Sequence, residues 1–227
     1  MKWVLAPAEF ARVWTIETGM QRQPYPMNVA AAELPADLPA TDGPRRHTRF
    51  ADPELSAALA LCSRPDSTVA TVYGERRRTG TPERILAVGS VVGRNAAVLV
   101  ANTDAVHVIG CQAKELASTL VEIIGSAPAG QHATMRQHQD SLLDPDVPVP
   151  DSGDRFRRLL RAPVDTRGVV TVTVAPGHPT TQTTSHRTWL DVRGDGRYLL
   201  TTAAAFTLAP VADQDFADHL DLLLGIR

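Results

Sequence analysis

The residues of this 227-residue chain that could bind a metal or transfer protons do not form a known motif. His132 and His138 are six positions apart, a spacing that fits neither a helical zinc-binding pair nor a zinc finger. Cys62 and Cys111 are the only cysteines, too few for a four-cysteine zinc site or a disulfide-stapled scaffold. We therefore expect no metal site and interpret all histidines as surface or hydrogen-bonded core residues. The histidines are His47, His107, His132, His138, His178, His186 and His219.

Signatures of covalent catalysis and of nucleotide binding are also absent from the sequence. No G-x-S-x-G, G-x-G-x-x-G or G-x-x-x-x-G-K-[ST] pattern occurs, and Gly89-Ser90 falls within a strand pattern. Arg193-Gly194-Asp195 matches an adhesion tripeptide, but Asp-Gly between two strand patterns is typical of a tight hairpin turn. We expect no cofactor and no enzymatic activity. The alternative, a small hydrolase with an unrecognised site, requires a pocket that contains a perturbed histidine or carboxylate.

The most distinctive charged run is Arg76-Arg77-Arg78, which lies in the segment Glu75 to Glu83 between two expected strands. A hairpin needs only a short turn, and long hairpin loops often carry function. The alternative interpretation is a solvated run of like charges with no partner. A second long segment, Pro176 to Ser185, occupies the corresponding place later in the chain and is rich in Thr and Pro.

Composition limits the class of partner. Hydrophobic residues make up 43% and charged residues 21% of the chain, as in an ordinary globular domain. The formal net charge of -2 provides no strong positive field, so neither nucleic acid nor an anionic membrane is an expected partner. The apolar stretch after Lys2 is interrupted at Pro7, which predicts neither a signal peptide nor a membrane span. We expect a cytoplasmic protein.

Hydrophobic periodicity predicts an α+β chain. Apolar residues alternate in the expected strands and recur every three to four positions in the expected helices. Segments rich in Pro and polar residues, 24–49 and 126–150, are interpreted as an extended surface segment and a linker with one helical turn near 140–143. The expected strands are 3–5, 68–73, 84–92, 97–101, 106–109, 169–174, 186–192, 197–202 and 206–209, and the expected helices are 7–18, 52–63, 114–124, 154–161 and 213–224.

The two halves of the chain align without gaps at an offset of one hundred residues. Val69, Thr71 and Val72 correspond to Val169, Thr171 and Val172, and the helix before Gly125 corresponds to the helix before Gly225. We interpret this as an internal duplication within one domain, 1–227, with pseudo-repeats at about 51–125 and 153–225 and a linker at about 126–152. The alternative is that similar periodicities converged. Two antiparallel meanders should form a central sheet with flanking helical bundles.

Several segments resemble the EspG family of ESX secretion-associated proteins. They are WVLAPAEFARVW followed by QPYPM, DPELSAALALCSRPDSTVATVYG, and WLDVRGDGRYLL followed by TLAPVA. The resemblance covers nearly the whole chain, which is shorter than familiar members and departs most between Ala30 and Phe50. It implies a pseudo-twofold α+β fold. It also implies a cytosolic chaperone of a type VII secretion system that binds a PE–PPE heterodimer by covering the hydrophobic tip of the PPE subunit.

The resemblance further implies a contact surface made of the central sheet, the first long hairpin loop and the C-terminal helical region. In the final helix we expect Phe216, Leu220, Leu223 and Leu224 to be core, so the exposed flank is the candidate for contact. The candidate partner-binding residues are Arg76, Arg77, Arg78, Thr79, Gly80, Thr81 and Pro82 in the loop and Asp215, Asp218 and His219 in the helix. An alternative function is a structural scaffold that forms a homodimer and has no exported client.

Overall fold

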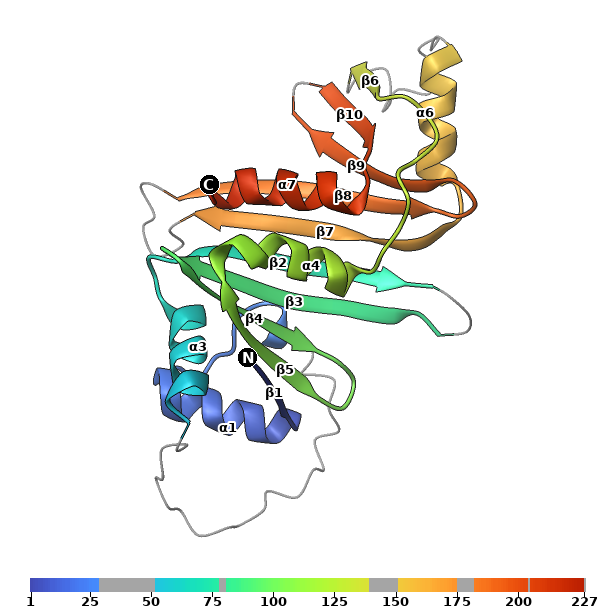
Figure 1. Ribbon diagram of the computed structural model, residues 1–227. Helices are drawn as coiled ribbons and strands as arrows, with labels where there is room; N and C mark the ends of the chain where they lie inside the picture. The colour runs from blue at the N-terminus through green and yellow to red at the C-terminus, as the bar shows by residue number, and fades with distance from the viewer. Residues whose placement is uncertain (29–51, 78–80, 139–150, 175–181, 204, 227) are drawn as a thin grey trace.

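The computed structural model describes residues 1–28, 52–77, 81–138, 151–174, 182–203 and 205–226 (Figure 1). The basic segment Arg45 to Arg49, the helical turn expected near 140–143, and three loop residues, Arg78, Thr79 and Gly80, lie outside these ranges. The strands are β1 (Lys2–Leu5), β2 (Thr68–Arg76), β3 (Glu83–Val92), β4 (Asn95–Ala101), β5 (Val106–Gln112), β6 (Met135–His138), β7 (Val164–Val174), β8 (Thr183–Val192), β9 (Gly196–Thr202) and β10 (Ala205–Pro210). The helices are α1 (Pro7–Thr18), α3 (Pro53–Ser63), the short 3-10 helix η1 (Ala113–Glu115), α4 (Leu116–Ile124), α6 (Asp151–Arg161) and α7 (Asp213–Leu224).

The described strands form one antiparallel sheet, so the predicted α+β class is confirmed (Figure 1). The strand order is β1-β5-β4-β3-β2-β7-β8-β9-β10-β6. Each predicted four-stranded meander is present, and β2 pairs with β7 to join the two meanders. The short strands β1 and β6 pair with β5 and β10 at the two edges of the sheet.

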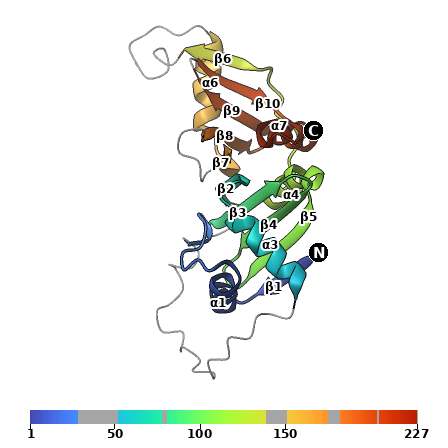
Figure 2. The same ribbon diagram turned by 90° about the vertical axis from the view of Figure 1, so that its left-hand side faces the viewer.

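Two layers of helices cover different parts of the two sheet faces. Helices α4 and α7 lie next to each other on one face, over the central strands (Figures 1 and 2). On the opposite face, α1 and α3 cover the strands of the first meander, and α6 covers strands of the second. Figure 2 shows β2 and β7 between these two coverings. None of the described helices has both the length and the apolar character that a bilayer crossing demands.

Local sequence explains where the helices begin and end. Pro7 and Pro53 occupy first helical positions, where the missing backbone N–H costs no hydrogen bond. The Asp52 carboxylate accepts hydrogen bonds from the backbone N–H groups of Glu54 and Leu55 and caps α3. Gly225 ends α7 at a φ of 70°, in the left-handed region that favours glycine.

The sequence predictions differ from the structure mainly at element ends. Strand β2 extends through Arg76, because its residues up to Arg76 pair with both β3 and β7. Strand β7 starts at Val164 instead of 169, because Val164 pairs with Val192 of β8 and the residues from Thr166 onward pair with β2 and β8. Strand β6 lies in the region predicted to be a linker and is held by β10. The Arg193-Gly194-Asp195 segment forms the predicted turn between β8 and β9, with Gly194 at a φ of 76°.

A buried arginine connects the second meander to α4 and α7, the two helices that lie side by side on one face of the sheet. Arg197 of β9 is fully buried and donates to the Asp191 carboxylate at 2.7 and 2.9 Å. It also donates to the Asp213 carboxylate at the start of α7 and to the carbonyl of Gly125 after α4, at 2.8 and 2.5 Å. Its Cζ atom lies 5.7 Å from the centre of the Phe216 ring. The ends of α4 and α7 are therefore held by one guanidinium group.

We expect the substitution Arg197→Met to lower the free energy of unfolding by about 3–5 kcal/mol, because it leaves two carboxylates without their cation. Urea denaturation would measure the loss. The matched control is Arg193→Met, whose ion pair with Asp165 is exposed, and it should change stability by less than about 1 kcal/mol. Equal losses in the two variants would contradict the central role of Arg197.

Candidate partner-binding face

The part of the sheet between the α3 and α6 coverings forms the candidate site. Ala70 and Val72 of β2 and Val170 and Val172 of β7 pack beneath α4 and α7. Because side chains alternate between the two faces of a strand, their neighbours face the opposite side. There the α3 and α6 coverings border the site at Val69 and Leu190. We call these residues the central strip: Thr71, Tyr73 and Glu75 of β2, Arg167, Val169, Thr171 and Thr173 of β7, and Thr184, His186, Thr188 and Leu190 of β8.

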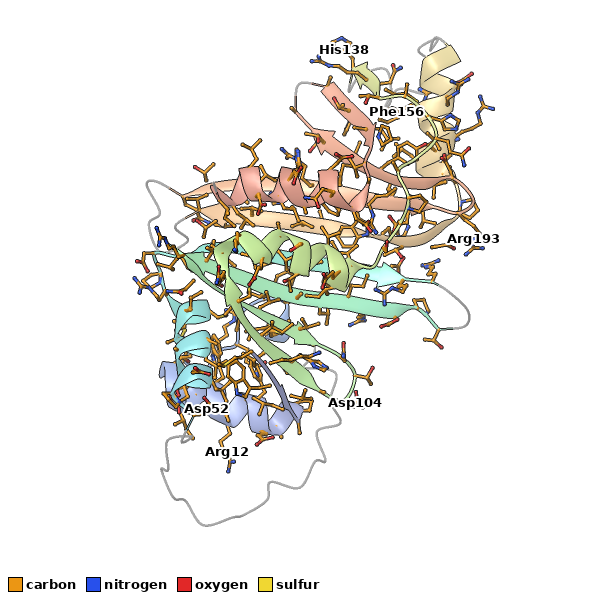
Figure 3. All side chains as sticks on the ribbon, in the orientation of Figure 1. Arg12, Asp52, Asp104, His138, Phe156 and Arg193 are labelled. Carbon is orange, nitrogen blue, oxygen red and sulfur yellow. The ribbon has the colours of Figure 1, made fainter. Side chains whose placement is uncertain are left out.

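The central strip contains a groove of about 450 Å³ whose accessible lining is mainly apolar. Tyr73 and Val169 pair across β2 and β7 in its middle. On the side of the first meander, Tyr25 stacks on Tyr73 with 6.1 Å between ring centres. On the other side, Leu190 packs in the same cluster as Phe156 of α6, which Figure 3 labels. The groove therefore offers an aromatic and aliphatic centre.

The floor of the strip depends on two glycines. Gly74 and Gly168 pair with each other across β2 and β7, and the buried ring of Trp189 lies against both on the face covered by α4 and α7. A Cβ atom on Gly168 would overlap the Trp189 ring and approach the carbonyl oxygen of Tyr73 to 2.5 Å. These close contacts explain why residues without side chains occupy both positions.

Charged groups gather at the end of the strip nearest the β2–β3 hairpin. Glu75 accepts from Arg167 Nε at 2.6 Å and forms an ion pair with Arg77 Nη2 at 3.0 Å. Burial acts to raise the pKa of the Glu75 carboxyl, but the hydrogen bonds from Arg167 and Arg77 outweigh it, so the pKa is lowered. Glu75 is therefore held as an anion between two cations.

From the Thr71–Thr171 pair in its middle to the opposite end, the strip carries hydroxyl groups and the imidazole of His186 instead. The Thr171 hydroxyl lies 2.9 Å from His186 Nδ1, and the hydroxyls of Thr173 and Thr184 are 3.5 Å apart. Such groups can adapt their hydrogen bonds to different partners because each hydroxyl both donates and accepts. The strip thus changes from charged to apolar to hydroxylated along its length.

Arg76, predicted to lie in the loop, is part of β2, and its side chain turns toward α4. Its Nη2 donates to the carbonyls of Ile123 and Ile124 at 3.1 and 2.9 Å, and its Nη1 pairs with Glu83. A cation is favourable at a helix C-terminus, where carbonyls lack intrahelical partners. Arg76 therefore caps a helix of its own chain.

The other described loop residues are more accessible. Arg77 is half exposed, and its backbone N–H donates to the carbonyl of Asp165, which ties the start of the loop to β7. Thr81 and Pro82 are exposed just before β3. The accessible part of the predicted loop thus lies beside the charged end of the central strip.

The predicted residues of α7 lie on the other face of the sheet from the central strip. Asp215 accepts from the backbone N–H of Ala212 at 3.4 Å, and Asp218 accepts from Gln214 at 2.8 Å. His219 Nε2 accepts from Arg187 Nε at 2.6 Å. The structure therefore places the two groups of candidate residues on different surfaces. Of the expected core residues, Phe216, Leu220 and Leu224 are buried, and Leu223 is partly buried against the same cluster.

None of the predicted contact residues lies at the centre of the strip. The sequence could have indicated that Tyr73, Val169 and Arg167 share an exposed face, since they alternate with buried residues on two long strands. Pairing of β2 with β7 joins them into one surface, and that pairing was not predicted.

The histidines and acidic residues of the described ranges bear on the metal-site and hydrolase alternatives. Within the described ranges, no group of three or more His, Cys, Asp or Glu side chains is placed to hold a metal ion. Burial, followed by the charge of Lys2, lowers the pKa of His107, whose Nε2 lies 3.1 Å from Asn102. The described pocket beside His107 is lined without any Ser, Thr or Cys that could act as a nucleophile.

The sheet, its helices and the central strip define an α+β protein with a groove on one sheet face. Residues 7–221 match the family model of the EspG family, so the chain belongs to that family. A chain in the solved structure of the Mycobacterium tuberculosis type VII secretion system chaperone EspG5 in complex with the PE25–PPE41 dimer has a similar fold, with a TM-score of 0.62 and 10% identity. The match covers 100% of this chain and 96% of that chain. No curated protein sequence matches the chain.

We expect Gly168→Ala to destabilise the protein by about 1–3 kcal/mol, because the new methyl group must displace the Trp189 ring or the β2 backbone. Urea denaturation would measure the loss, and the near-ultraviolet circular dichroism would report the movement of the indole. Gly110→Ala is the control, since its Cβ would lie 3.7 Å from Trp3, and it should change stability by less than about 0.5 kcal/mol. An unchanged Gly168→Ala protein would contradict this account of the floor.

We expect acid to weaken the α7–β8 contact through His219. Burial first, and the charge of Arg187 second, lower the pKa of His219 below its ordinary value of 6.5. Folding therefore favours the neutral ring, and this contribution is complete above pH 6.5 and is lost as the pH falls through the lowered pKa. His219→Gln keeps an acceptor for Arg187 and does not titrate. The wild type should lose more stability than this variant between about pH 7 and pH 5, and parallel denaturation profiles would refute the prediction.

Proposed function

We propose that this chain is a cytosolic chaperone that binds the PPE subunit of a PE–PPE heterodimer and covers its hydrophobic tip before type VII secretion. The observation that carries the proposal is the apolar centre of the central strip, found in a chain of the EspG family. The structurally similar EspG5 is a chaperone in complex with a PE25–PPE41 dimer, which supports the same class of partner here.

The central strip has features that suit such a task. An exposed apolar helical tip aggregates unless another surface covers it. Specific interfaces bury about 800 Å² per partner, which is larger than the groove alone and requires its borders as well. Tyr25, Tyr73 and the accessible loop residues Arg77, Thr81 and Pro82 would supply those borders. Arg78, Thr79 and Gly80 are proposed as members of the same contact loop from the sequence alone.

The flank of α7 is a weaker part of this proposal. Asp215, Asp218 and His219 already bond within the chain and lie across the sheet from the strip. A partner that wraps around the sheet edge, or a second partner, would be needed to use them. The chaperone acts by binding, so we propose no catalysed reaction and no cofactor.

We also propose that the fold arose by duplication within a single domain, with repeats at about 51–125 and 153–225 and helical bundles flanking the sheet. The strand order supports this, because β5-β4-β3-β2 on one side is matched by β7-β8-β9-β10 on the other. Thr71 pairs with Thr171, the residue at the predicted offset of one hundred, so a twofold axis would pass through this pair. The alternative function of a homodimeric scaffold would use the same strip to bind a second copy.

Co-expression with the PE–PPE pair encoded nearest to this chain tests the function. A tag on one partner should recover a soluble complex with one copy of each protein. Val169→Glu places a charge in the apolar centre of the strip and should weaken binding by about 2 kcal/mol or more, about 30-fold. Val174→Glu, on the same strand but on the face of α4 and α7, is the control and should bind like the wild type.

Failure to recover any PE–PPE pair would refute the chaperone function. A homodimer in multi-angle light scattering that is disrupted by Val169→Glu would then support the scaffold. Circular dichroism of both variants would establish that they remain folded.

A further inference from the structure

The two ends of the central strip differ although the backbone around them is similar. The pair Thr71–Thr171 lies in the middle of the β2–β7 ladder. From this pair the strands continue in one direction to Glu75 and Arg167 and in the other to Val69 and Thr173. A partner helix that contacts only the apolar centre could therefore lie across the strip in either of two opposite directions.

One end of the strip has an excess of positive charge. Among the described residues, its charged side chains are Glu75 of β2, Arg167 of β7 and Arg77 at the start of the loop, together with the neighbouring ion pair of Arg193 and Asp165. Arg84 of β3 also lines this end but already interacts within the chain, so the other three arginines exceed the two carboxylates by one positive charge. Figure 3 shows Arg193 at this end of the sheet.

The other end has no such excess. The strip residues there are Thr173 and Thr184, whose hydroxyls lie within 3.5 Å of each other. Among the described strip residues at this end, none carries a carboxylate, an ammonium or a guanidinium group. The difference between the ends is therefore one of charge.

The arginines at the charged end keep capacity for another acceptor. Arg167 and Arg77 share the Glu75 carboxylate, yet their side chains are 52% and 50% exposed. Each guanidinium carries more N–H donors than its share of one carboxylate can accept. A second carboxylate at this position would gain charge-assisted hydrogen bonds with planar, bidentate geometry.

We propose that the charged end of the central strip binds a carboxylate side chain of the partner protein, and that this contact fixes the direction in which the partner lies. This inference rests on the proposed function, since the partner is the helical tip of a PPE subunit. The apolar centre at Tyr73 and Val169 contributes affinity, whereas Arg167 and Arg77 select one of the two directions. Electrostatic contacts commonly add specificity of this kind to an apolar interface.

Two substitutions with opposite expected effects test the carboxylate contact. Arg167→Gln should raise the dissociation constant for the nearest-encoded PE–PPE pair by about 10- to 100-fold and reduce its dependence on salt. Glu75→Gln removes the competing carboxylate, so binding should be unchanged or tighter. If the Glu75–Arg167 pair were only structural, both variants would weaken binding alike. Thr184→Gln, at the uncharged end, is the matched control and should bind like the wild type.

Crosslinking would measure the direction in which the partner lies on the central strip. A photo-crosslinking amino acid at Thr81, beside the charged end, or at Thr184, at the other end, should attach to two separate segments of the PPE subunit. In the double variant Arg77→Gln, Arg167→Gln, each position should attach to both segments. Crosslinks that stay unchanged in the double variant would overturn the inference.

The outcomes separate the two proposals. If the wild type binds and Val169→Glu does not, while Arg167→Gln and Glu75→Gln both bind normally, the chaperone function stands and the carboxylate contact is refuted. If the wild type binds no PE–PPE pair, the function fails and the carboxylate inference fails with it.

Discussion

The antiparallel pairing of β2 with β7 joins two meanders that would otherwise each expose an edge strand along their longest side. Nine-residue β2 and eleven-residue β7 pair from Val69–Thr173 to Arg76–Thr166, so their backbone groups are satisfied in the middle of a continuous sheet. The helices that follow each meander then meet on one face, whereas those that precede each meander lie over the outer strands of the other face. The strip between them, over which no described helix is centred, is a direct consequence of this junction.

Two arginines hold α4 and α7 in place over the junction of β2 and β7. Arg76 and Arg197 both donate to carbonyls at the C-terminal end of α4, one from each meander, and Arg197 also neutralises Asp213 at the start of α7. Removing water from these groups is costly, so each guanidinium must keep its partners for the arrangement to be stable. Between the helices and the strip, the Trp189 ring fills the space left by Gly74 and Gly168. The central strip is thus supported from beneath by a layer of buried, packed side chains.

Much of the fold could be predicted from local patterns. Helix α7 was predicted with its observed bounds because a complete apolar stripe ends at Gly225, and α4 was predicted nearly as well. Strand ends were less predictable: the first residues of β7, Val164 to Gly168, do not alternate clearly, and they become a strand because β2 and β8 lie beside them. The loop prediction failed at Arg76 for a related reason, since only the position of α4 shows that this arginine faces helix carbonyls.

Periodicity, turn chemistry and motif order over short stretches were sufficient to predict the α+β class, the two meanders, most helix ends and the resemblance to the EspG family, to which the chain belongs. Tertiary structure decided which residues form the central strip. Tyr73 and Val169 are far apart in the sequence and become neighbours only through the register of β2 and β7. Only the tertiary structure shows which arginines bond to groups of their own chain and which remain exposed, because electrostatic interactions depend on distance in space and not on separation in the sequence.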